Sequence, residues 1–227
     1  MIPSFDPLYP KPPYIYDAQI VVGIIQAGEE KSKLKRFLPY DFEPTGQIVF
    51  ITGFYPEIKA QGNKKLKPYY ETVVLLLVDY KGRFGSFCPF IWVSTDEALC
   101  AGREIWGFPK KLAEFSFTFK ENRIKALTKR FDDLILSIDS KELATAEPQP
   151  INLGETFLEK NIPFADGRDN KKIVSVKLEG IQIEESLAGT ATVESKDKHL
   201  SDLIPKQETL IFFAKAKLIL PFGKEIE

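Results

Sequence analysis

Hydrophobic and polar residues alternate along most of the chain in short runs, which is the pattern of half-buried β-strands. The runs are rich in β-branched, leucine and aromatic residues and occupy residues 19–25, 47–54, 71–78, 84–93, 124–131, 134–138, 173–183, 190–194 and 209–220. The pair Asp132-Asp133 separates two of these runs and favours a tight hairpin between them. The pattern therefore predicts a protein that consists mostly of β-strands.

Only two stretches predict helices, and both are short. The first covers residues 29–37 and ends before Pro39. The second opens at Ser94-x-x-Glu97, which resembles a capping box, and runs through Arg103. We therefore predict a mainly β (α+β) fold, in the form of an antiparallel β-barrel or a strongly curved sheet with a few short helices.

The chain shows no internal repeat and no low-complexity linker, so we expect residues 1–227 to form a single domain. The looser stretch 141–172 is interpreted as a loop-rich connection within that domain. Residues 1–15 contain five prolines, which excludes a helix or a central strand there. We expect this segment to be an extended N-terminal arm.

Composition excludes several classes of partner. The chain has 31 Lys plus Arg against 32 Asp plus Glu and a net charge of -1, so it carries no bulk positive field for nucleic acid. The longest strongly apolar stretch, 73–78, is too short to span a membrane. The N-terminus does not resemble a secretory signal, and Cys88 and Cys100 are expected to be free, buried thiols of a reducing compartment. We therefore expect a cytoplasmic location.

Cofactor-dependent chemistry has little support in the sequence. His199 is the single histidine, which excludes His-rich metal sites, and we interpret it as structural. Neither a Gly-x-Gly-x-x-Gly motif nor a phosphate-binding P-loop occurs. We expect neither a metal nor a nucleotide cofactor.

The most informative segment is 101–115, where two lysines follow a turn. Gly107 and Pro109 both oppose a helix, so the helix should end there and a strand should begin at Lys110. The apolar residues around this turn provide a wall that could remove an ammonium group from water, and such removal favours the neutral amine. Alternation by itself would direct Lys111, with Phe115, toward an aromatic core. The pattern alone does not decide which lysine faces a pocket.

The block Gly-Arg-Glu-Ile-Trp-Gly-Phe-Pro-Lys-Lys at 102–111 resembles the signature of the acetoacetate decarboxylase family. In that family, a lysine after Tyr/Phe-Pro forms a Schiff base with a ketone, and a second lysine follows it. Glu71 occupies the place of the family's active-site glutamate, and segments at 189–190 and 199–205 are also similar. The resemblance covers residues 15–222 approximately.

The resemblance implies that Lys110 is the Schiff-base nucleophile, that Lys111 helps to keep it uncharged, and that Glu71 transfers protons. It also implies a double-cone-like curved sheet, a homo-oligomer, and chemistry without metal or cofactor. Repulsion between two ammonium groups about 10 Å apart is roughly 1.7 kcal/mol at an effective dielectric of 20. Burial of a lysine has a larger effect, so we expect the apolar wall to contribute more than Lys111.

Large aromatic residues near these positions are candidates for binding the substrate. Phe108 adjoins Pro109 and Lys110, and Tyr69 and Tyr70 flank Glu71; from the latter pair we select Tyr70. The full set of candidate binding residues is Phe108, Trp106, Trp92 and Tyr70.

Two features of the family pattern are missing. The stretch 20–28 lacks the arginine that holds the substrate carboxylate in the family, and 48–53 lacks a second acidic residue. We therefore predict a Schiff-base-forming lyase that decarboxylates a β-keto acid, and the missing arginine favours a keto compound other than acetoacetate. The alternatives are a lysine-dependent aldolase-dehydratase acting on pyruvate and an aldehyde, and a non-catalytic barrel that binds a small hydrophobic carbonyl compound.

Overall fold

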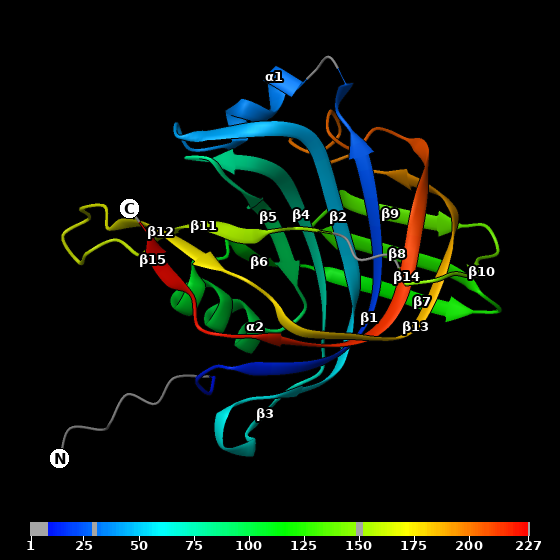
Figure 1. Cartoon of the computed structure of the whole chain (residues 1–227), viewed down its shortest axis with the longest axis horizontal. Coiled ribbons are helices and arrows are strands. Elements are labelled where there is room, and N and C mark those ends of the chain that lie inside the picture. The colour runs from blue at the N-terminus through cyan, green and yellow to red at the C-terminus, as the bar shows by residue number, and fades with distance from the viewer. Residues whose placement is uncertain (1–8, 29–30, 149–151, 227) are drawn as a thin grey trace.

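The computed structural model describes residues 9–28, 31–148 and 152–226. Within these ranges the protein is dominated by one large sheet of 15 strands that curves strongly around the molecule (Figure 1). The hydrogen-bonded path runs from β15 at one end to β7 at the other and does not close into a barrel among the described residues. The prediction of a mainly β fold with a few short helices is confirmed. Of the two predicted forms, a closed barrel and a strongly curved sheet, the structure shows the curved sheet.

The first seven strands are β1 (Tyr14–Gln26), β2 (Phe42–Lys59), β3 (Lys65–Leu66), β4 (Tyr69–Tyr80), β5 (Arg83–Val93), β6 (Lys110–Leu112) and β7 (Glu114–Lys120). The others are β8 (Arg123–Arg130), β9 (Asp133–Ser140), β10 (Ala144–Thr145), β11 (Glu155–Asn161), β12 (Lys171–Val176), β13 (Glu179–Glu194), β14 (Gln207–Leu220) and β15 (Lys224–Ile226). The helical segments are α1 (Lys31–Leu34), η2 (Lys35–Phe37), η3 (Gln61–Asn63), α2 (Asp96–Ala101) and the π-helical turn η4 (Gly102–Trp106).

The sheet has a buried cluster on each face. Along β4, Val73 and Leu75 belong to one apolar cluster, whereas Val74 and Leu76 belong to the other. Successive residues of a strand point to opposite faces, so these clusters lie on opposite sides of the sheet. We call them the Val73 cluster and the Val74 cluster. Burial on both faces explains why 73–78 is a continuous apolar run instead of an alternating one.

Strand pairing is antiparallel along most of the path, and the exceptions are near the turn at residues 107–109. β5 pairs in parallel with β6 and with β11, and it pairs antiparallel with β4. β8 and β9 form the hairpin that Asp132-Asp133 predicts. The stretch 141–172, for which the sequence predicts a loop-rich connection, also contains β10 and the seven-residue strand β11.

The second helix begins one residue later than the capping-box pattern predicts. Thr95 is the N-cap, and its side chain accepts a hydrogen bond from the backbone N of Ala98 at 3.4 Å. The hydroxyl of Ser94 instead accepts from the backbone N of Tyr70 at 2.9 Å, because Ser94 still follows the β4–β5 pairing. The helical path ends at Gly107, whose φ of 90° is left-handed and favours glycine.

The other local predictions have mixed outcomes. Of the helix predicted at 29–37, the first two residues lie outside the described ranges and the rest form α1 and η2. Of the N-terminal arm, residues 1–8 are also outside them, and Tyr14 already belongs to β1. The hydroxyl of Tyr9 donates to Glu104, so the described part of the arm contacts η4. No helix in the described ranges is long and apolar enough to cross a membrane.

Candidate active site

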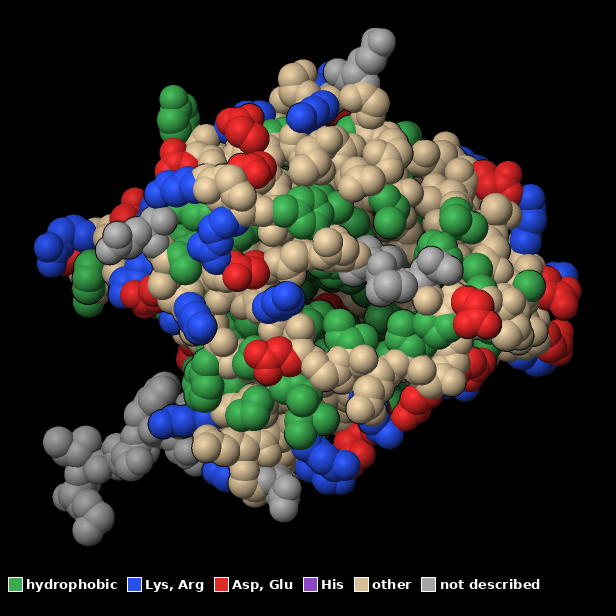
Figure 2. All heavy atoms as spheres, viewed as in Figure 1, with side chains coloured by type: hydrophobic (Ala, Val, Ile, Leu, Met, Phe, Trp, Pro, Cys, Tyr) green, Lys and Arg blue, Asp and Glu red, His purple; other side chains and the backbone are tan. Residues whose placement is uncertain are grey.

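A cavity of about 120 Å³ lies on the Val73 side of the sheet. Figure 2 shows hydrophobic side chains around a hollow near the middle of this view. The polar side chains that line the cavity are Tyr16, Tyr55, Tyr69, Glu71, Lys110 and Thr156. The remaining wall consists of aliphatic side chains and Phe108. An apolar cavity with a few convergent polar groups is the usual composition of a small-molecule site.

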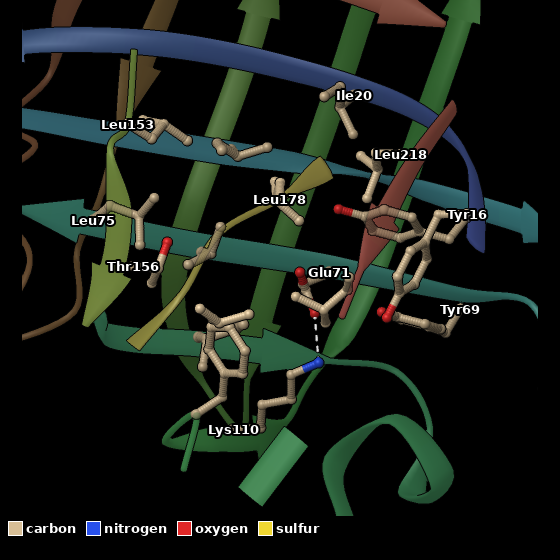
Figure 3. Close-up of a pocket in the computed structure, with 17 residues that line it drawn as sticks. Tyr16, Ile20, Tyr69, Glu71, Leu75, Lys110, Leu153, Thr156, Leu178 and Leu218 are labelled. Carbon is tan, nitrogen blue, oxygen red and sulfur yellow. Dashed lines mark hydrogen bonds and ion pairs between the residues drawn. The ribbon is translucent and has the colours of Figure 1, made fainter. Parts of the chain in front are cut away.

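Lys110 and Glu71 form an ion pair inside this cavity (Figure 3). The Nζ atom of Lys110 donates to Oε2 of Glu71 at 2.8 Å, and the two side chains are only 8% and 13% exposed. Nζ also lies 5.5 Å from the ring centroid of Tyr69 and 5.6 Å from that of Phe108. Transfer of one proton along this hydrogen bond would give a neutral amine and a carboxylic acid in direct contact.

Three neighbouring strands bring these two residues together. Ile91 of β5 pairs with Val73 of β4 on one side and with Lys110 of β6 on the other. Glu71 precedes Val73 by two residues on β4, so it points to the same face. Residues 39 positions apart in sequence thus meet because β5 lies between their strands.

The lysine that enters the cavity is Lys110, whereas Lys111 is exposed. Phe115, Phe117 and Phe119 are half-buried and pack against the Val74 cluster on the other face. Lys110 and these three phenylalanines differ in strand parity, so regular alternation through β6 and β7 places them on opposite faces of the sheet. The structure agrees with this arrangement. Lys111 shares the strand parity of Phe115, but its side chain is exposed at β6 and does not reach an aromatic core.

The turn before Lys110 is held by Gly102. Its carbonyl accepts hydrogen bonds from the backbone N of Gly107 and of Phe108, both at 3.0 Å. A Cβ atom at Gly102 would lie 2.5 Å from Cδ and 2.6 Å from Cε of Lys110. The absence of a side chain at residue 102 therefore leaves the space that the lysine stem occupies.

We expect Gly102→Ala to lower the rate at which Lys110 reacts with ketones by about 10²-fold, the scale of a displacement of about 1 Å at a reacting group. The added methyl group must push the lysine stem aside. The measurement is the rate of borohydride-trapped adduct formation. The fold should be unaffected, since Gly102 has helical φ and ψ of −61° and −44° and alanine favours helix. An unchanged rate would contradict this account of Gly102.

Three tyrosines surround the ion pair. Tyr16 and Tyr69 are hydrogen-bonded to each other, and the rings of Tyr55 and Tyr69 stack at 5.1 Å. Burial, and then the nearby Glu71 carboxylate, raise the pKa of Tyr55 and of Tyr69 well above the ordinary value. These phenols are therefore neutral hydroxyl groups at any physiological pH.

Of the four aromatic residues predicted to bind substrate, Phe108 lines the cavity and the other three do not. Trp106 is buried behind Phe108, and its indole N donates to the carbonyl of Pro221 at 2.8 Å. Trp92 packs in the Val74 cluster beside Phe90. Tyr70 stacks on Phe54 and Phe115. The structure thus places Trp106, Trp92 and Tyr70 outside the cavity.

Strand periodicity explains the positions of Trp92 and Tyr70. Once Glu71 is assigned to a pocket, Tyr69 and Val73 must share its face and Tyr70 must point away. The same argument applied to β5 places Ile91 in the cavity and Trp92 on the opposite face. Tyr16 and Tyr55 were missed because nothing local links β1 and β2 to the lysine block.

The remaining candidates lie away from the cavity lining. The ring of His199 stacks near Phe90 at 6.4 Å. Cys88 is buried, and burial raises the pKa of its thiol. Cys100 is only half-buried, so the expectation of two buried thiols is wrong for this residue. Within the described residues, no three His, Cys, Asp or Glu side chains are grouped to hold a metal ion.

The stretch 20–28 contributes Ile20 to the cavity wall, and 48–53 contributes Ile51. Lys110 is the only lysine or arginine among the described residues that line the cavity. Each of the two stretches that depart from the family pattern therefore contributes an apolar side chain to the wall.

Comparison with known proteins agrees with the resemblance seen in the sequence. The family model described as acetoacetate decarboxylase (ADC) matches residues 7–212. An acetoacetate decarboxylase of Burkholderia cenocepacia is 25% identical over 199 residues, which cover 85% of this chain and 78% of that protein.

Solved structures with the same fold include an acetoacetate decarboxylase and an enzyme of another pathway. The crystal structure of acetoacetate decarboxylase from Legionella pneumophila has a TM-score of 0.84 at 24% identity and covers 99% of this chain and 91% of that one. The enduracididine biosynthesis enzyme MppR, complexed with the condensation product of pyruvate and imidazole 4-carboxaldehyde, has a TM-score of 0.79 at 15% identity, with coverages of 96% and 90%. At these identities the likeness establishes the fold alone.

Proposed function

Because the chain belongs to the acetoacetate decarboxylase family, we propose that it is a lyase that decarboxylates a β-keto acid through a Schiff base on Lys110. One observation carries the proposal: the Lys110 amine lies 2.8 Å from the Glu71 carboxylate in a mostly apolar cavity. This arrangement supplies a nucleophile and a proton carrier in contact, with water largely excluded.

The first half of the reaction forms the iminium. The neutral amine of Lys110 attacks the keto carbon, and the carbonyl π-electrons move to oxygen to give a carbinolamine after proton transfer. Glu71, as the carboxylic acid, then gives its proton to the departing hydroxyl group. Water leaves, and the lysine nitrogen is joined to the substrate carbon as a cationic iminium.

The second half breaks the carbon–carbon bond. The electron pair of the bond to the carboxylate moves into the iminium, whose nitrogen accepts it, and carbon dioxide leaves with formation of an enamine. A proton from the solvent adds to the enamine carbon and regenerates the iminium. Addition of water and release of the amine then give the ketone and restore Lys110, so the cycle needs no external electron acceptor.

Borohydride trapping tests the covalent step. The protein is incubated with acetoacetate, with longer β-keto acids and with pyruvate, and is then reduced and mapped by mass spectrometry. Adducts confined to Lys110, together with release of carbon dioxide from a β-keto acid, are the expected result. If no carbonyl compound gives an adduct, only the non-catalytic binding function is left.

The same assay tests the lesser role of Lys111. We expect Lys111→Ala to retain trapping at Lys110 within about tenfold, because the Lys111 side chain is exposed and interactions of exposed charges are worth about 1 kcal/mol or less. The quantity compared is the initial trapping rate at equal ketone concentration. A loss as complete as that caused by removal of Lys110 would show that repulsion by Lys111 keeps the nucleophile uncharged.

A second candidate is an aldolase-type lyase that uses the same iminium to make or break a bond to an aldehyde. The observation that favours it is the absence of a second cation among the described lining residues. A decarboxylase must bind the carboxylate of its β-keto acid, and the described lining offers that group no cation of its own, whereas an uncharged ketone that reacts with an aldehyde needs none. Trapping does not separate the two reactions. Carbon dioxide is the product of the first, whereas an aldehyde is consumed or released in the second.

A further inference from the structure

The cavity has two chemically different ends. Figure 3 shows Lys110, Glu71 and Tyr69 on one side, and Ile20, Leu178 and Leu218 extending in from the other. The reacting carbon of a substrate must lie at the first end, within reach of the lysine nitrogen. Whatever is attached to the keto carbon on the side away from Lys110 must therefore contact aliphatic side chains.

The described side chains that line the cavity provide no cationic partner for an anion at the aliphatic end. Lys110, the one cationic side chain of the described lining, is already bonded to Glu71 at 2.8 Å. The buried tyrosines Tyr55 and Tyr69 are neutral, because burial raises the pKa of each phenol well above its ordinary value, and their rings stack at 5.1 Å. A carboxylate at the aliphatic end would lose its hydration without gaining a cation, which is strongly unfavourable.

The volume of the cavity limits the size of the group that it encloses. An apolar cavity of about 150 Å³ in another protein holds benzene, which has six heavy atoms. The cavity here, at about 120 Å³, is of similar size. It therefore matches a small ketone with an aliphatic chain of a few carbon atoms, such as pentan-2-one.

We propose that the natural substrate has a short, uncharged aliphatic tail of about three carbon atoms on its keto carbon, in place of the single methyl group of acetoacetate or a second carboxylate. The tail would lie against Ile20, Leu178 and Leu218 while the keto carbon meets Lys110. This inference rests on the proposed Schiff-base function, and it specifies the substrate class on which that function acts.

A series of methyl ketones tests the tail independently of decarboxylation. Acetone, butanone, pentan-2-one, hexan-2-one and octan-2-one are each titrated against the protein with cyanoborohydride, and the half-saturating concentration of the Lys110 adduct is measured. The mass added is that of the ketone less one oxygen atom. We expect affinity to rise about fourfold per methylene up to pentan-2-one, which corresponds to about 0.8 kcal/mol per buried CH₂, and to level off or fall beyond it.

A charged analogue of the same length provides the matched comparison. In 4-oxopentanoate, the terminal methyl group of pentan-2-one is replaced by a carboxylate, and we expect its affinity to be at least tenfold lower than that of pentan-2-one. Leu218→Ala, which removes about three carbon atoms from the aliphatic end, should move the optimum to a longer ketone. Ile20→Ala serves the same purpose at a half-buried position if the first variant folds poorly.

The possible failures are distinguishable. Adducts on Lys110 with equal affinity along the ketone series, or with preference for 4-oxopentanoate, would overturn the aliphatic-tail inference and leave the Schiff-base function intact. Absence of any adduct with any ketone would overturn both.

Discussion

Lys110→Arg is expected to abolish both adduct formation and turnover, with a loss in rate on the order of 10⁴-fold or more, as for removal of other enzyme nucleophiles. A guanidinium group is not deprotonated in proteins, so it cannot attack a carbonyl carbon. It can still pair with the Glu71 carboxylate, which Lys110 contacts at 2.8 Å. The substitution therefore removes the nucleophile while it preserves the positive charge of the site.

The matched control is Lys111→Arg, the same substitution one residue further along β6. Because the side chain of Lys111 is exposed, we expect near-normal trapping and turnover. Both variants should show the circular dichroism and thermal midpoint of the wild type. Adducts that persist in Lys110→Arg and map to Lys111 would reverse the assignment of the nucleophile.

The part of the site that the sequence predicts best is the turn before Lys110, because the residues that form the turn lie next to the reactive lysine in the chain. Gly107, Pro109 and the lysine block define a turn into a strand, and these local signals are strong. Lys110 and Glu71 were paired through the family resemblance, because contact between them depends on β5 lying between β4 and β6. No local pattern encodes that non-consecutive, partly parallel arrangement.

The walls of the cavity were harder to predict than its polar centre. Ile20, Ile51 and Leu218 come from strands distant in sequence, and each also fits an ordinary core position. Large aromatic residues near the lysine block are candidates for binding the substrate because of their size. Trp92 and Trp106 nevertheless pack in the interior and do not line the cavity. Large side chains fill cores more often than they line sites, and for a strand residue such as Trp92 strand parity distinguishes the two uses.

The site lies on a strand in the middle of the open sheet. A strand in the middle of the path is covered on both faces, so β4 presents Glu71 and Val73 to one buried cluster and Val74 to the other. The polar pair therefore lies in an interior whose apolar walls were already required for folding. The reactivity that we propose for Lys110 and Glu71 rests on this burial.

Glu71→Gln is expected to reduce turnover by about 10²- to 10⁴-fold, the usual contribution of a general acid–base group. An amide cannot donate the proton that the departing hydroxyl group requires. The Lys110 adduct should still form at equilibrium, because the lysine nitrogen remains in place and loses the anion that favoured its protonated form. Slow turnover with a normal trapped amount at long times would identify Glu71 as the proton carrier.

Stability measurements on the same residues test whether the pair is buried as an interacting unit. Removal of one partner of a buried ion pair leaves an uncompensated charge and typically costs about 3–5 kcal/mol; we expect about 3 kcal/mol for Lys110→Met, because the Glu71 side chain retains 13% of its exposure. The double variant Glu71→Gln/Lys110→Met has no charge left to compensate, so its free energy of unfolding should recover toward the wild-type value. Additive losses in this cycle, measured by urea unfolding, would mean that the two side chains do not interact, and the hydrogen bond that starts the proposed reaction would lose its basis.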